Sequence, residues 1–153
     1  MIRVLFVCLG NICRSPMAEA VFMHLVREAG LENKIEADSA GTGSWHIDSV
    51  PHPGTLGILE AKGIPYEGLG RQIKRDDLDK FDYIVTMDDE NLRNVRRLGK
   101  GRAKVAPLLD YAPHAEIREV PDPYFDGGFD VVYHLVHEGA VGLLAAIRQE
   151  HGL

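Results

Sequence analysis

Apolar and polar residues follow one another along the chain in blocks that predict strands and helices in turn. Ile2 to Val7 is an apolar run broken only by Arg3, which is typical of a central parallel strand buried on both faces. The next apolar residues recur at helical spacing: Ala18, Val21, Phe22, Leu25, Val26 and Ala29. Ser15 as N-cap, Pro16 as the first helical residue and Gly30 as the C-terminal stop predict the bounds of this helix.

Similar blocks fill the rest of the chain. We expect further strands at 34–39, 81–87 and 103–109, and helices around 55–62, over 88–100 and from 132 to 147. A long loop, 110–126, comes before the last helix. Strands that alternate with helices imply right-handed crossovers. The pattern therefore predicts an α/β fold in which one parallel sheet is covered by helices on both faces, with residues 1–153 forming a single domain.

The composition is that of a globular protein. Of the 153 residues, 45% are hydrophobic and 26% are charged, and the formal net charge is -6. This argues against a general nucleic-acid binder, because such proteins carry a basic surface. The N-terminal apolar run is too short for a membrane span and lacks the cleavage site of a signal peptide. We therefore expect a cytoplasmic protein without membrane contact, whose two cysteines are reduced.

Four polar segments fall where predicted strands end or in the long late loop. They are the segment around the two cysteines, "DSAGTG", "TMDDE" and "VPDPYF". Ligands of parallel α/β sheets bind at the carboxyl ends of the strands. We therefore expect these segments to meet at one edge of the sheet.

The segment from Cys8 to Ser15, "CLGNICRS", has the composition of a phosphate cradle with a built-in nucleophile. It joins a strand to a helix N-terminus, where free N–H groups and positive potential favour an anion. Gly10 permits backbone conformations closed to most residues, and Asn11 tolerates the left-handed region, so successive N–H groups can form an anion-binding nest. Arg14 supplies a planar fork for two phosphate oxygens, and the same field favours the thiolate of Cys8.

Displacement at phosphorus also requires an acid for the leaving oxygen, and Asp122 is the candidate. It lies between Pro121 and Pro123, which stiffen the backbone on both sides. Each of these residues also has a purely structural interpretation. Cys8 alone fits the buried end of a strand, Asp122 fits an ordinary turn, and Cys13 fits a packing residue that displacement chemistry does not need.

Together these residues carry a resemblance to a known family. The segments "VCLGNICRSPMAEAVF", "DSAGTGSWHI", "RQI", "FDYIVTMDDENL" and "DPYF" occur in order over nearly the whole chain and closely resemble the low-molecular-weight protein tyrosine phosphatases. The resemblance implies a flavodoxin-like three-layer sandwich with a four-stranded parallel sheet. It also implies hydrolysis of phosphotyrosine and small aryl phosphates through a phosphocysteine intermediate, with no metal or other cofactor.

The functional residues of that family match positions of this chain. Cys8 matches the nucleophile, Arg14 the clamp on the phosphoryl oxygens, and Asp122 the general acid that then serves as base for the attacking water. Ser15 matches the hydroxyl that stabilises the thiolate. The backbone N–H groups of the phosphate-binding loop would come from Leu9, Gly10, Asn11, Ile12 and Cys13.

Further positions match the surroundings of the loop. Asn11 and Ser39 match a hydrogen-bonded pair that supports it. Trp45, Tyr124 and Phe125 match the walls of the substrate cleft, where aromatic rings suit a phenyl ring.

Gly68 departs from the family, which often has a histidine three residues before the arginine of "RQI" as a brace for the loop. The brace is expected to be absent or replaced by water or backbone. Two rival activities occur on the same fold. An arsenate reductase would need further cysteines, and none follows Cys13. A protein-arginine phosphatase of this family has threonine where Ile12 stands, and an apolar Ile12 near Tyr124 and Phe125 favours an aromatic ester.

Other classes of protein fit the residues less well. A phosphotyrosine-binding module would need Arg14 but neither Cys8 nor Asp122, and zinc binding would need Cys/His spacings that the chain lacks. The family suggests that Cys8 and Cys13 can form a protective disulfide, which makes Cys13 a redox residue. The expected partners are a tyrosine-phosphorylated protein as substrate and phosphate or another oxyanion as inhibitor, and the expected state is a monomer or a weak dimer.

Overall fold

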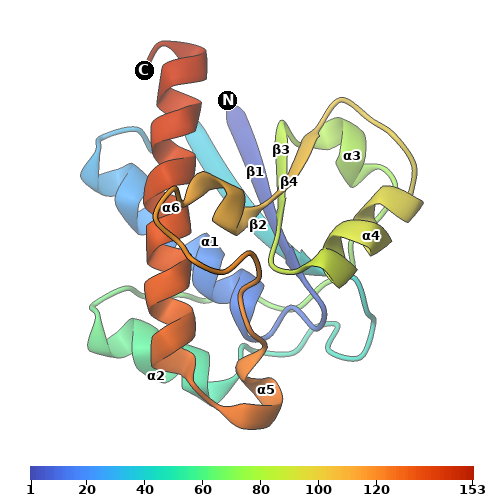
Figure 1. Cartoon of the computed structure of the whole chain (residues 1–153), viewed down its shortest axis with the longest axis vertical. Helices are drawn as coiled ribbons and strands as arrows, with labels where there is room; N and C mark the ends of the chain where they lie inside the picture. The colour runs from blue at the N-terminus through green and yellow to red at the C-terminus, as the bar shows by residue number, and fades with distance from the viewer.

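The computed structural model describes the backbone of all 153 residues and every side chain except that of Asp126. Its centre is one sheet of four strands: β1 Ile2–Cys8, β2 Ile35–Gly41, β3 Tyr83–Thr86 and β4 Lys104–Pro107. Neighbouring strands are parallel and lie in the order β2-β1-β3-β4. The predicted α/β fold with a four-stranded parallel sheet is confirmed (Figure 1).

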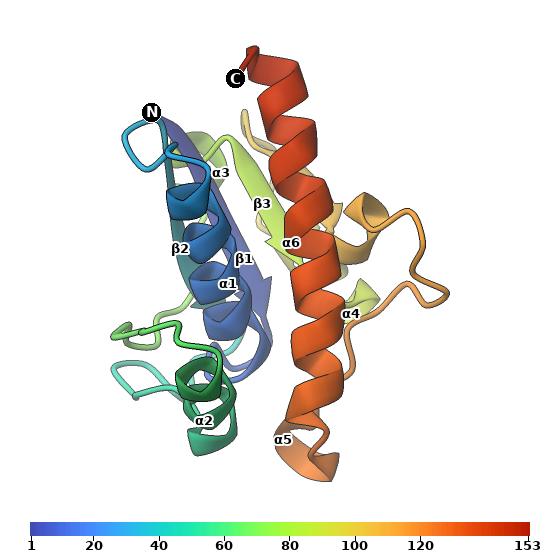
Figure 2. The ribbon, with the colours of Figure 1, turned by 90° about the vertical axis from the view of Figure 1, so that its left-hand side faces the viewer.

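Helices cover both faces of this sheet (Figures 1 and 2). On one side lie α1 Arg14–Glu28, α2 Pro53–Ala61 and α6 Phe129–His151, and on the other lie α3 Asp77–Lys80 and α4 Asp89–Arg97. Between β4 and α6 the chain forms a 3-10 turn, η1 Leu108–Tyr111, and a short helix, α5 Pro123–Asp126. The result is the expected three-layer arrangement.

Strand β1 shows why the protein needs helices on both faces. Its alternate residues Val4 and Phe6 pack in the core beneath α1 and α6, and Leu5 and Val7 pack in the core on the α3 and α4 side. The ring of Phe6 meets that of Phe22 from α1 edge to face, with centroids 5.4 Å apart. A strand that is apolar at every position except Arg3 therefore lies in the middle of the sheet.

The start of α1 differs from the prediction. The helix begins at Arg14 with Cys13 in the N-cap position, and no side chain caps it. Ser15 is therefore not the N-cap: it lies in the first turn, where its hydroxyl contacts Cys8 and Asn11 instead of a helix N–H. The predicted C-terminal stop is confirmed, because Gly30 follows the helix in the left-handed region with φ 69°.

Several other bounds differ by a few residues. β3 and β4 are shorter than the apolar runs that predicted them, because Phe81, Met87 and Leu109 are buried in the core without belonging to a strand. The helix predicted around 55–62 begins at Pro53, and the predicted loop 110–126 contains α5. Apolar patterns report burial, and burial extends beyond the hydrogen-bonded ladder.

Among the described helices, α6 alone has the length and apolar composition of a membrane span. Its apolar residues have partners within the fold. Val136, Ala140, Leu143 and Ile147 are fully buried in the core that α6 shares with α1. Packing against the sheet accounts for the composition of this helix.

Candidate active site

The loop between β1 and α1 lies at the carboxyl edge of the sheet, as predicted for the cysteine segment. Neighbouring segments hold its backbone. The Thr42 N–H donates to the Cys8 carbonyl at 2.9 Å, and the His52 N–H donates to the Ile12 carbonyl at 2.8 Å. These bonds fix the loop and engage carbonyl oxygens that would otherwise repel an anion.

The Cys8 thiol lies at the centre of a buried hydrogen-bond network. The Asn11 N–H donates to Cys8 Sγ at 3.2 Å, and Ser15 Oγ lies 3.0 Å from the same sulfur. Asn11 Nδ2 donates to Ser15 Oγ at 2.8 Å. The Ser15 oxygen accepts this bond, so its own hydrogen has two acceptors, Cys8 Sγ at 3.0 Å and the more distant Ala40 carbonyl at 3.5 Å. The arrangement suits a negatively charged sulfur at the N-terminus of α1.

Asn11 and Gly10 shape the loop in different ways. Asn11 has a left-handed backbone, with φ 59°, and its Oδ1 accepts the Arg71 N–H at 2.9 Å. This agrees with the tolerance expected of Asn11. Gly10 does not have a positive φ, so the expected reason for glycine is wrong. A Cβ on Gly10 would lie 3.1 Å from His46 Cδ2, so glycine leaves room for the imidazole.

Arg14 is a buried cation with its carboxylate partners close by. Its Nη1 donates to Asp88 Oδ2 at 2.7 Å and to the Val120 carbonyl at 2.9 Å, and its Nη2 lies 3.5 Å from Asp122 Oδ2. Burial acts to lower the pKa of Arg14, but the negative charges of Cys8 and of the two aspartates outweigh it and raise the pKa overall. The guanidinium is therefore charged at any working pH.

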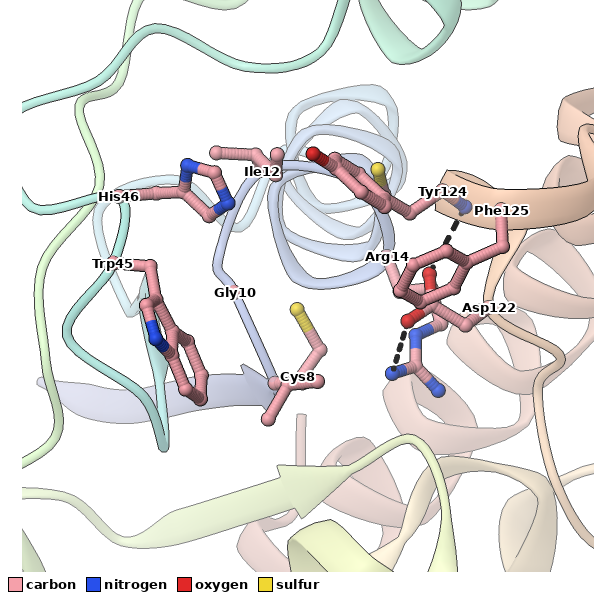
Figure 3. Close-up of a pocket in the computed structure, with 11 residues that line it drawn as sticks. Cys8, Gly10, Ile12, Arg14, Trp45, His46, Asp122, Tyr124 and Phe125 are labelled. Atoms are coloured by element: carbon pink, nitrogen blue, oxygen red, sulfur yellow. Dashed lines mark hydrogen bonds and ion pairs between the residues drawn. The ribbon is translucent and has the colours of Figure 1, made fainter.

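Asp122 occupies the N-cap of α5 instead of an open loop. Its Oδ1 accepts the Tyr124 N–H at 3.1 Å, and its Oδ2 faces Arg14 (Figure 3). Pro123 takes the first helical position, which fixes the start of α5. The two predicted catalytic partners of Cys8 therefore converge from distant parts of the chain.

A cavity of about 260 Å³ opens above Cys8. Figure 3 shows Trp45 and His46 on one side of it, Tyr124 and Phe125 on the other, and the Cys8 sulfur directed into the space between them. Trp45 is 71% exposed and Phe125 is 77% exposed, so both rings form walls of a cleft and not parts of the core. The predicted cleft residues are brought together.

Ser39 does not pair with Asn11, and that expectation is corrected. Its hydroxyl lies 3.4 Å from the Tyr66 hydroxyl, which donates to Glu19 Oε1 at 2.8 Å. The main chain of Arg71 holds the Asn11 side chain instead. The Ser39 hydroxyl therefore belongs to a neighbouring network beside the loop.

Tyr66 takes the space that a side chain at position 68 would need. A Cβ on Gly68 would lie only 2.0 Å from the Tyr66 hydroxyl. Tyr66 fills this space but bonds Ser39 and Glu19 instead of the loop, and the backbone N–H of Arg71 supports Asn11. Burial raises the pKa of Tyr66, and the adjacent Glu19 raises it further. Burial also raises the pKa of Glu19.

Cys13 is buried and is a free thiol, as is Cys8. Burial, with a further contribution from Cys8, raises the pKa of Cys13 to about 12. At neutral pH this side chain is therefore an uncharged thiol, whereas a nucleophilic cysteine reacts as the thiolate.

Sequence reasoning missed two residues of this site. Asp88, which binds Arg14, was not among the predicted site residues, although "TMDDE" was placed at the correct sheet edge. His46, which lines the cavity, lies in the quoted segment "DSAGTGSWHI" but was not predicted as a cleft residue. His46 is identified by its contacts, since it lies over Gly10 and its ring centroid is 6.1 Å from that of Tyr124.

The fold and the site define a class of protein: an α/β sandwich in which a cysteine ends the first strand at a helix N-terminus, faced by an arginine and an aspartate between aromatic walls. The family described as "Low molecular weight phosphotyrosine protein phosphatase" matches residues 3–152. The chain belongs to this family of hydrolases.

Individual relatives agree with this assignment. The chain is 51% identical to the low molecular weight protein-tyrosine-phosphatase YfkJ of Bacillus subtilis over 100% of both chains. The crystal structure of YfkJ matches with a TM-score of 0.95, covering 98% of this chain and 96% of that chain. The phosphotyrosine protein phosphatase of Schizosaccharomyces pombe is 49% identical over 86% of this chain and 88% of its own length. The crystal structure of DARP, a Drosophila arginine phosphatase, matches with a TM-score of 0.90 at 35% identity, covering 95% and 97% of the two chains.

Proposed function

We propose that this protein hydrolyses phosphotyrosine in proteins through a phosphocysteine intermediate, with Cys8 as the nucleophile. The observation that carries the proposal is the environment of the Cys8 sulfur. It accepts the Asn11 N–H, lies 3.0 Å from Ser15 Oγ and stands at the N-terminus of α1. Both contacts favour a thiolate, which is the reactive form of cysteine.

In the first step, the Cys8 thiolate attacks phosphorus. The sulfur–phosphorus bond forms, the bond to the phenolic oxygen breaks, and Asp122 gives its proton to that oxygen. In the second step, Asp122 takes a proton from a water molecule that attacks the phosphocysteine. The sulfur–phosphorus bond breaks, inorganic phosphate is released and the Cys8 thiolate is restored.

Arg14 serves as the clamp on the phosphoryl oxygens in this proposal. Asp88 and the Val120 carbonyl both accept from Nη1, so the oxygens of the transferring group are bound by Nε and by Nη2, which also lies 3.5 Å from Asp122 Oδ2. Backbone N–H groups of the loop from Leu9 to Cys13 add donors around the phosphate. A guanidinium held in this way needs little reorganisation when charge develops on those oxygens.

The walls of the cavity support an aromatic substrate. Trp45 and Tyr124 face each other across the space above Cys8, where stacking on a phenyl ring contributes about 0.5–1.5 kcal/mol. Ile12 also lines the cavity, and its apolar side chain offers no hydrogen bond to a guanidinium. Phosphotyrosine is therefore favoured over phosphoarginine, although the fold is shared with an arginine phosphatase.

The test is a substrate panel with matched cysteine variants. Wild-type protein is expected to hydrolyse para-nitrophenyl phosphate and a phosphotyrosine peptide without added metal, and phosphoserine and phosphoarginine peptides at least about tenfold more slowly. Cys8→Ser is expected to lose activity by about 1000-fold or more, whereas the control Cys13→Ser stays active. Full activity in Cys8→Ser protein would overturn the mechanism, and faster hydrolysis of phosphoarginine would overturn the substrate.

A further inference from the structure

A second hollow adjoins the mouth of the candidate active site. It has a volume of about 340 Å³, and Leu9 and Trp45 line both this hollow and the cavity above Cys8. Gln72 lines one side of it, and Asn94 and Arg97 of α4 line the other. We name this hollow the α4 groove. A chain that leaves the cavity past Trp45 therefore enters the α4 groove directly.

The α4 groove is basic at the end that lies away from the cavity. Arg97 is exposed and lines the groove, and the exposed Arg93 lies one helical turn before it on the same face of α4, outside the lining. Nη1 of Arg97 donates to Asn94 Oδ1 at 3.1 Å. Among the described side chains, no ion pair includes Arg93 or Arg97. Their charges are available to a ligand.

This positive charge is local, and its sign is opposite to that of the net charge of the whole protein. The formal net charge is -6, yet residues 93–104 contain no acid. The same stretch contains these basic residues: Arg93, Arg96, Arg97, Lys100, Arg102 and Lys104. Arg75 packs against the end of α4, because a Cβ on Gly99 would lie 2.8 Å from its Nε. An acidic ligand is therefore attracted to this end of α4 although the molecule as a whole repels it.

We propose that the α4 groove binds an acidic segment of the phosphoprotein substrate, on one side of its phosphotyrosine. The inference rests on the proposed phosphatase function, which places the phosphotyrosine ring between Trp45 and Tyr124. Charge complementarity with Arg97, to which the neighbouring Arg93 adds positive charge, selects the segment. The enzyme then reads the sequence next to phosphotyrosine as well as the ring.

Glu90 sets the distance at which an acid is accepted. Its side chain also lines the α4 groove, and it precedes Arg97 by seven residues, about 10 Å along the helix axis. An acid beside Glu90 is repelled, and an acid near Arg97 is attracted. Since an extended peptide covers about 3.3 Å per residue, an acid beside Arg97 lies about three residues further along the peptide than the position beside Glu90, and we place the test acids three or more residues from phosphotyrosine.

The experiment compares three phosphotyrosine peptides of equal length. One carries acidic residues three to five positions before phosphotyrosine, one carries them at the same distance after it, and one carries glutamines at both places. Wild-type protein is expected to favour one acidic peptide by about 3–10-fold in kcat/KM, and the preference is expected to fall as sodium chloride rises, because exposed charges are screened.

Matched variants on one helix locate the effect. Arg97→Glu is expected to abolish the preference for the acidic peptide and to leave hydrolysis of para-nitrophenyl phosphate unchanged, because that compound does not reach the α4 groove. Arg96→Glu makes the same charge change one residue away, outside the lining of the groove, and is expected to keep most of the preference. Arg97→Gln is the milder variant if the charge reversal impairs folding.

Each outcome separates the inference from the function on which it rests. Equal kcat/KM for acidic and neutral peptides in the wild-type protein overturns the proposal that the α4 groove binds an acidic segment, and it leaves the proposed phosphatase function intact. Equal losses in Arg96→Glu and Arg97→Glu also overturn it, because the effect is then one of general charge. Failure to hydrolyse any phosphotyrosine peptide overturns the proposed function and this inference together.

Discussion

Asp88 connects Arg14 to the start of α4 through its two carboxylate oxygens. Oδ2 accepts from Arg14 Nη1 at 2.7 Å, and Oδ1 accepts the Asn91 N–H at 2.8 Å as the N-cap of the helix. One side chain therefore orients the guanidinium and fixes the helix whose other end borders the α4 groove. Asp88 therefore contributes both to the candidate active site and to the fold.

Replacing Asp88 separates these two roles. Asp88→Asn keeps an N-cap oxygen but loses the charge that holds Arg14, so kcat/KM for para-nitrophenyl phosphate is expected to fall about tenfold. The free energy of unfolding is expected to change little. Asp88→Ala also loses the cap and is expected to cost about 1 kcal/mol more. Steady-state kinetics and urea unfolding measure both. Wild-type kinetics in Asp88→Asn would show that Asp88 does not position Arg14.

Asp122→Asn tests the general acid. Asparagine keeps an acceptor for the Tyr124 N–H, so α5 is preserved while the acidic proton is lost. The loss in kcat is expected to grow with the pKa of the leaving phenol, from about tenfold for para-nitrophenyl phosphate to about 100-fold or more for phenyl phosphate, because poor leaving groups need the proton most. An equal loss across a series of aryl phosphates would argue against the acid role.

Cys13→Ser tests whether Cys13 protects Cys8 from oxidation. Peroxide converts the Cys8 thiolate to a sulfenic acid, which the Cys13 thiol condenses to a disulfide with release of water. Because the pKa of Cys13 is raised to about 12, condensation is expected to be slow at neutral pH and to quicken as pH rises. After peroxide and then dithiothreitol, wild-type protein should recover more activity than Cys13→Ser. Equal recovery would remove Cys13 from this role.

Gly68→His tests whether Tyr66 occupies the space that a histidine at position 68 would need. A side chain at 68 would collide with the Tyr66 hydroxyl, so the single change is expected to destabilise the protein by about 1–3 kcal/mol. The double change Tyr66→Ala with Gly68→His opens the space, and the two effects should be less than additive. Urea unfolding of both single variants and the double variant measures the coupling. Full additivity would show that the two positions do not share the space.

Glu19→Gln tests the buried carboxyl beside Tyr66. Burial raises the pKa of Glu19, so with rising pH the unfolded chain loses this proton before the folded protein does. The free energy of unfolding therefore falls as pH rises from the ordinary glutamate pKa to the raised one. Glutamine does not titrate, so the stability of Glu19→Gln relative to wild type should increase as pH rises above the ordinary glutamate pKa of about 4.3. A difference independent of pH would contradict the raised pKa.

The sequence predicts the sheet and the central loop well because both depend on local patterns. β1 is apolar at nearly every position and ends at Cys8, and Arg14 and Ser15 begin α1 a few residues later. Contacts between residues that are far apart in the sequence are harder to predict. Asp88 reaches Arg14 across 74 positions, and Arg71 reaches Asn11 across 60. Neither contact has a spacing rule, so periodicity could not reveal them.

Ser15 shows a second limit of local rules. A serine before a proline at a helix start is a good N-cap by statistics. In the folded protein the Cys8 sulfur and the Asn11 amide engage its hydroxyl instead. Local preference fails here because a buried polar group at a functional loop has stronger partners than the helix N–H groups.

Trp45 is the one tryptophan of the chain, and it stands 71% exposed between the cavity and the α4 groove. Its indole is therefore a built-in optical probe. All tryptophan emission from this protein comes from a ring at the mouth of the site, so a ligand that stacks there changes the signal without any label. Tryptophan fluorescence can therefore follow substrate binding separately from the chemical steps that come after it.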